Sequence, residues 1–86
     1  MAASQTVYSV VAFTQIGADA FAELPERASG AAAALARAKV LASTHAGVIA
    51  WSRGVYPQSG EYADPLILVR LGVIPDWFDA TGAVGG

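Results

Sequence analysis

The pattern of apolar and polar residues predicts three strands. Residues 6–13 (TVYSVVAF), 48–56 (VIAWSRGVY) and 66–71 (LILVRL) are each rich in β-branched or aromatic side chains. We expect each run to form a strand, and the third run is the most apolar of them. Residues 14–28 contain Gly, Asp and Pro, which predicts a long loop with one short helical turn.

A helix is predicted to follow Ser29. The run GAAAALARAKVLASTHAG combines alanines with Leu, Arg and Lys, all of which are strong helix formers. Ser29 is a suitable N-cap, and Gly47 suits the left-handed residue that ends many helices. At about 100° per residue, the predicted apolar face consists of Ala31, Ala34, Leu35, Ala38, Leu41, Ala42 and His45.

The segment PQSG, residues 57–60, predicts a hairpin turn between the second and third strands. A hairpin with residues 56 and 61 beside its turn fixes the pairing of the two strands. Two apolar pairs and one ion pair are then expected: Trp51 with Leu66, Ile49 with Leu68, and Arg53 with Asp64.

The order strand, helix, strand, strand predicts an α+β fold. A helical crossover returns the chain parallel to the first strand, and the hairpin adds an antiparallel strand, which we place between the other two. The result is a small β-α-β-β unit (split βαβ, half ferredoxin-like), a three-stranded sheet with one main helix packed on one face. We expect a single α+β domain over residues 1–75 and a short C-terminal tail over residues 76–86, aromatic and then Gly-rich.

The second face of this sheet needs a cover, because one helix can cover only one face and a bare apolar face is unusual in a monomer. We expect a homodimer, formed through the sheet face or by extending the sheet at an edge. Asp76 and Asp79 bracket two aromatic residues, which predicts either a docking motif or an intramolecular lid over the open face. The predicted interface residues are Ile67, Val69, Trp77 and Phe78.

Composition and charge exclude several classes of function. The 86 residues fit one domain, and 5 basic against 7 acidic residues give a net charge of -2, without the excess of cations that binds a phosphate backbone. No cysteine and a single histidine exclude thiol chemistry, cysteine metal sites and two-histidine metal sites. We expect no metal, no cofactor and no nucleic-acid partner.

The chain shows no sign of membrane insertion or export. No apolar run approaches the roughly 18 residues of a membrane span, and the start MAASQ lacks the basic region of a signal peptide. We expect a cytoplasmic protein without a membrane partner, which associates with itself or with another protein.

Few residues offer chemistry. His45 would act either as a lone general base or as a helix C-terminal residue that interacts with carbonyls, and we favour the second interpretation. Arg53 and Arg70 would clamp an anion only if they lay close together, and the expected register separates them. Glu61 and Asp64 are interpreted as a solvated loop rather than a cation site. The sequence shows no recognisable Ser-His-Asp triad, so we assign no catalytic residue.

Three functions follow from these observations. The first is a small, non-catalytic homodimeric interaction or accessory module, which follows from the lack of a catalytic arrangement and the excess of apolar strand surface. Residues 34–53 and 60–72 resemble small bacterial proteins of uncharacterised function with a βαββ core, and this resemblance implies no functional residues. The second is a dimeric ferredoxin-like small-ligand-binding protein or enzyme with a pocket between helix and sheet. The third is a structural subunit of a larger assembly. The ligand-binding residues of the second hypothesis are Tyr8, His45, Arg53 and Tyr62.

Overall fold

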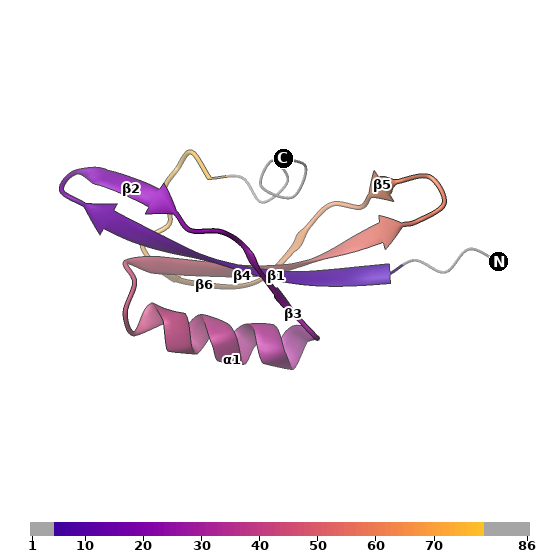
Figure 1. Ribbon diagram of the computed structural model, residues 1–86, viewed down its shortest axis with the longest axis horizontal. Coiled ribbons are helices and arrows are strands. Elements are labelled where there is room, and N and C mark those ends of the chain that lie inside the picture. The colour runs from indigo at the N-terminus through magenta and orange to yellow at the C-terminus, as the bar shows by residue number, and fades with distance from the viewer. Residues whose placement is uncertain (1–4, 79–86) are drawn as a thin grey trace.

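The computed structural model describes residues 5–78, and in this part of the chain one six-stranded sheet carries one helix. The elements are, in chain order, β1 (Gln5–Ile16), β2 (Asp19–Ala22), β3 (Glu26–Ala28), α1 (Ala31–Ala42), β4 (Gly47–Tyr56), β5 (Glu61–Tyr62) and β6 (Leu66–Gly72). Every pair of neighbouring strands is antiparallel. The β1–β2 and β4–β5 hairpins bend away from α1, so the sheet curls into a half-barrel with α1 on its convex face (Figure 1).

The predicted three-stranded split βαβ sheet, half of a ferredoxin-like fold, is wrong. β1 and β4 pair directly and antiparallel, and β6 lies on the outer side of β4 rather than between the two. The reason lies in residues 14–28, which form β2 and β3 along the other edge of β1 instead of a loop. Gly17, with a φ of 62°, allows the tight turn between β1 and β2.

This extra hairpin changes the direction in which the chain enters the helix. The strand that leads into α1 is β3, which runs antiparallel to β1. β4 follows the helix and is also antiparallel to β1. The helical crossover therefore joins β3 to β4, and β1 is the strand between them.

α1 is shorter than predicted and lacks the predicted cap. Its N-cap residue is Gly30, without a side-chain hydrogen bond, so Ser29 does not cap the helix. The helix ends at Ala42, and the hydroxyls of Ser43 and Thr44 donate to carbonyls of its last turn. The centre of the predicted apolar face is confirmed by three buried residues: Ala34, Ala38 and Leu41. In the described part of the chain, no helix has the length and apolar character of a membrane span.

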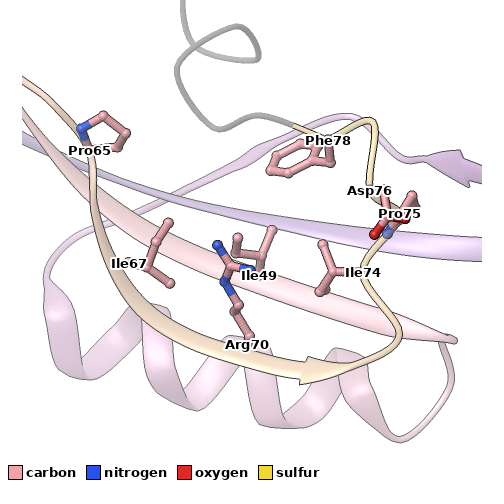
Figure 2. Close-up of a pocket in the computed structure, with 8 residues that line it drawn as sticks. All are labelled: Ile49, Pro65, Ile67, Arg70, Ile74, Pro75, Asp76 and Phe78. Carbon is pink, nitrogen blue, oxygen red and sulfur yellow. The ribbon is translucent and has the colours of Figure 1, made fainter.

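Gly47 does not end the helix in a left-handed conformation, as predicted, but begins β4. A Cβ atom at this position would lie 1.9 Å from the carbonyl oxygen of Val73, so only glycine lets the chain that follows β6 approach β4 this closely. Gly72, which pairs with Gly47, has a φ of 71°. After this residue the chain crosses to the face opposite α1, where it carries Phe78 over the sheet (Figure 2).

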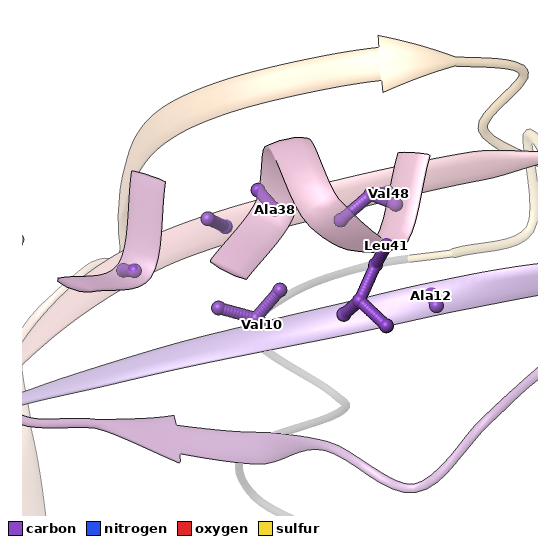
Figure 3. Packing of buried hydrophobic residues seen from close by; sticks show 7 residues of the cluster. Val10, Ala12, Ala38, Leu41 and Val48 are labelled. Carbon is purple, nitrogen blue, oxygen red and sulfur yellow. The ribbon is translucent and has the colours of Figure 1, made fainter. Parts of the chain in front are cut away.

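Both faces of the sheet are apolar, because alternate residues of β1 and β4 belong to two clusters. Under the helix, small alanines allow close approach, and the buried residues are Val10, Ala12, Ala34, Ala38, Leu41, Val48 and Ala50 (Figure 3). On the opposite face the buried residues are Val11, Phe13, Ile49 and Trp51. We call this second surface the concave face.

The predicted hairpin is confirmed beside its turn, where the pairs are Val55 with Tyr62 and Tyr56 with Glu61. The expected pairing of Arg53 with Asp64 is not part of the ladder, because Asp64 lies between β5 and β6. Instead, the Nε atom of Arg53 donates to the carbonyl oxygen of Ala63 at 2.7 Å.

Further from the turn the predicted register is wrong. A bulge with Leu68 as the extra residue of β6 shifts the pairing with β4. The observed pairs are Trp51 with Ile67 and Ile49 with Arg70, in place of Leu66 and Leu68. Ile67 and Arg70 therefore share the concave face, whereas Val69 packs against the cluster under the helix.

Candidate functional site

The concave face is partly covered by the segment that follows β6. Ile74 and Phe78 pack against its buried cluster. The ring of Phe78 meets Phe13 edge to face, with centroids 5.0 Å apart, and its centroid lies 5.8 Å from that of Trp51. Of the two sequence hypotheses for the aromatic residues, this contact favours the intramolecular lid for Phe78. Asp79, the second acid of the predicted motif, lies outside the described residues.

A pocket of about 290 Å³ lies on the concave face between β6 and this covering segment. Six of its eight lining residues have apolar side chains: Ile49, Pro65, Ile67, Ile74, Pro75 and Phe78. Two charged residues complete the lining: Arg70 rises from β6 between Ile67 and Ile74, and Asp76 lies beside Pro75 at the other end (Figure 2). We call this space the charged pocket.

The two charges of this pocket have no protein partner among residues 5–78. No hydrogen bond or ion pair of that part of the chain involves the side chain of Arg70 or of Asp76. The two residues also do not pair with each other, although both line the same space. Within residues 5–78, the pocket therefore presents an exposed cation and an exposed anion without a protein partner, beside apolar side chains.

A second, wider groove of about 610 Å³ lies beside the β1–β2 hairpin. Its lining includes Gln15, Asp19, Phe21, Val73 and Trp77, and we call it the hairpin groove. Trp77 has an exposed fraction of 61%, although its ring centroid lies 6.1 Å from that of Phe13. Such a large exposed aromatic residue at the rim of a groove is typical of an interaction surface.

Two ion pairs connect the β2–β3 segment to α1 and to the residues that follow it. The Nε and Nη2 atoms of Arg37 donate to the two carboxylate oxygens of Glu26 at 3.0 and 3.2 Å, and this bond raises the pKa of Arg37. Past the end of α1, His45 Nε2 lies 2.8 Å from Glu23 Oε2. Thr14 also donates to Glu23, at 2.7 Å, and this hydrogen bond is the largest cause of the lowered pKa of Glu23, to which the charge of His45 adds.

His45 is held on both of its ring nitrogens. While Nε2 contacts Glu23, Nδ1 lies 2.9 Å from the carbonyl oxygen of Leu41 and 2.9 Å from Thr44 Oγ1. The carbonyl contact is the one expected of a residue at the end of a helix. In this state neither nitrogen is presented to a substrate.

The other predicted ligand-binding residues do not meet His45. Tyr8 packs partly buried against the cluster under the helix, in register with Ala28 just before α1, whereas His45 follows the other end of α1. Arg53 and Tyr62 do come together, with the guanidinium carbon 4.9 Å from the ring centroid. Between α1 and the sheet, the side chains of Val10, Ala34, Ala38, Leu41 and Val48 form a buried cluster.

The predicted interface residues divide between the two faces. Trp77, Phe78 and Ile67 lie on the concave side, but Val69 packs toward α1. The pair of Arg70 and Asp76 was missed, because a strictly alternating strand gives no sign that a bulge would set Ile67 and Arg70 on one face. The available signal was an arginine within an otherwise apolar strand, followed closely by an aspartate before two aromatic residues.

Residues 5–78 thus form a small antiparallel half-barrel with α1 on its convex face and with the charged pocket and the hairpin groove on its concave side. Comparison of the chain with protein-family models, with curated proteins and with solved structures found no match.

Proposed function

We propose that this protein is a non-catalytic homodimeric interaction module in which a second copy of the chain covers the concave face. The observation that supports this most directly is the 61% exposure of Trp77 at the rim of the hairpin groove. Tryptophan is among the residues that contribute most to binding energy at interfaces. The absence of catalysis is supported by His45, whose two ring nitrogens are both engaged by protein atoms. A cytoplasmic location stays a prediction from the sequence.

The structure favours association through a face over association through an edge. On one side the outer strands β2 and β3 are short and are separated by a segment that contains Pro25. On the other side, β6 carries the Leu68 bulge and the charged Arg70. Short strands, proline, bulges and charges are the features by which proteins prevent pairing between sheet edges.

An isologous dimer would bury both the exposed Trp77 side chain and the hairpin groove of each copy. In such a dimer the same patch of each copy contacts its equivalent. The side chain of Trp77 of each copy would enter the hairpin groove of the other. The groove has apolar lining from Phe21 and Val73 to receive an aromatic ring.

The test is the molar mass of the full chain in solution, measured by light scattering over a dilution series. We expect twice the mass of one chain at high concentration, and Trp77→Ser should raise the dissociation constant at least about tenfold. Val40→Ser is the matched control, because Val40 is 59% exposed on α1 and lies on the opposite side of the sheet. A strict monomer at every concentration would contradict the proposal, as would equal effects of the two substitutions.

A further inference from the structure

We infer that the charged pocket binds a small zwitterion with an apolar body, which in chemical terms is an amino acid with an apolar side chain. This inference does not assume the proposed dimer, although the two share a boundary, because Pro75 and Asp76 line both the charged pocket and the hairpin groove. It stands on the opposite charges of Arg70 and Asp76, which have no protein partner among residues 5–78, and on the apolar side chains that line the same pocket.

The apolar part of the pocket is built from the sheet and its covering segment. Ile49 in β4 is 2% exposed and forms the floor, and Ile67 in β6 continues it. Ile74 and Phe78 come from the covering segment, with the Phe78 ring facing the pocket from the other side (Figure 2). A branched aliphatic or aromatic side chain would lose contact with water here and gain contact with these groups.

The charged groups select the polar end of the ligand. The guanidinium of Arg70 matches a carboxylate, to which it can donate two parallel hydrogen bonds. The carboxylate of Asp76 is an acceptor for an ammonium group. A simple anion would satisfy Arg70 and face the charge of Asp76, and a simple amine would do the reverse. A zwitterion is the ligand that pairs with both.

The size of the pocket limits the ligand to a single small molecule. Its volume of about 290 Å³ lies just below the range of about 300–1,000 Å³ for ligand pockets. A free amino acid such as leucine fits this volume. A folded peptide segment is too large for it.

The experiment is a titration of the full, isotope-labelled chain with L-leucine, followed by the amide signals of Ile67, Arg70 and Asp76 in NMR spectra. Two analogues isolate the charges: 4-methylpentanoate lacks the ammonium group, and 3-methylbutylamine lacks the carboxylate. We expect saturable shifts with L-leucine and at least about tenfold weaker binding of each analogue, which corresponds to about 1.4 kcal/mol.

Substitutions in the pocket provide the second arm of the test. Arg70→Gln and Asp76→Asn should each weaken L-leucine binding at least about tenfold, while Lys39→Gln and Glu61→Gln, which change exposed charges away from the pocket, should leave it unchanged. Circular dichroism verifies that each variant is folded. The inference is overturned if L-leucine gives no saturable shift up to about 10 mM, if 4-methylpentanoate binds equally well, or if the pocket variants bind like the controls.

Discussion

At the scale of single residues, Gly47 and Trp51 occupy positions where the packing constrains the size of the side chain. Gly47 permits the close approach of the chain after β6, because its missing side chain leaves room for the Val73 carbonyl. Trp51 is 1% exposed at the centre of the concave face, and within residues 5–78 its Nε1 atom has no hydrogen-bond partner. The first position depends on the absence of a side chain, and the second on the volume of a large one.

Gly47→Ala should destabilise the protein by about 1–3 kcal/mol, because the new Cβ atom would meet backbone atoms that cannot rotate away. Gly30→Ala is the matched control: Gly30 has an extended backbone, with nothing within 4 Å of an added Cβ atom. Free energies of unfolding from urea titrations compare the two variants. Equal stability of both would show that β4 and the segment after β6 do not lie this close.

Trp51→Ala should destabilise the protein by about 3–5 kcal/mol, because it removes a fully buried aromatic side chain and leaves a cavity. Trp51→Phe should cost much less, since it keeps an aromatic ring and removes a buried N–H group without a partner in the described chain. Trp77→Ala, at a residue 61% exposed, is the control. Chemical denaturation at low protein concentration measures all three, and a loss within a few tenths for Trp51→Ala would contradict the burial.

At the scale of elements, polar contacts fasten the β1–β2–β3 side of the sheet to the helix. Glu23 follows β2 and is contacted by Thr14 of β1 and by His45 beyond α1. The carboxylate of Glu23 therefore connects the end of β2 to β1 and to the segment that follows α1. Because the pKa of Glu23 is lowered in the folded protein, its ionised form contributes stability.

The contribution of Glu23 is present above its ordinary pKa of 4.5 and is lost as the pH falls through the lower value of the folded state. Glu23→Gln should therefore make unfolding free energy less dependent on pH in this acid range. Melting curves between about pH 3 and about pH 7 measure the effect. Glu61→Gln, at an exposed residue of β5, is the control. If both variants keep the pH dependence of the natural chain, Glu23 does not link folding to pH.

At the scale of the whole molecule, the helix is too short for the sheet that it covers. Twelve residues of α1 span about 18 Å, whereas the 12 residues of β1 span about 40 Å. The ends of the sheet therefore extend past the helix, and Ile16 and Leu66 remain 65% and 66% exposed. The concave face has its own short cover in Ile74 and Phe78. A dimer is the arrangement that would reduce this exposed apolar surface, and the Trp77 substitution tests it.

Much of the local structure could be predicted from the sequence. β4, β6 and the core of β1 follow from runs of β-branched and aromatic residues, the helix from its alanines, and the PQSG turn from its composition. Each of these depends on interactions between residues close in the chain. The buried face of the helix was also predictable, because its period of about 3.6 residues is a local property.

The sequence by itself thus determined most elements and the excess of apolar surface, but only the tertiary structure decided how the strands are arranged. Residues 14–28 have weak strand character and pair because β1 offers them a free edge. That pairing makes β4 antiparallel to β1 and removes the split βαβ arrangement. Likewise, the Leu68 bulge belongs to the pairing of β6 with β4, and it is this bulge that places Ile67 and Arg70 in one pocket.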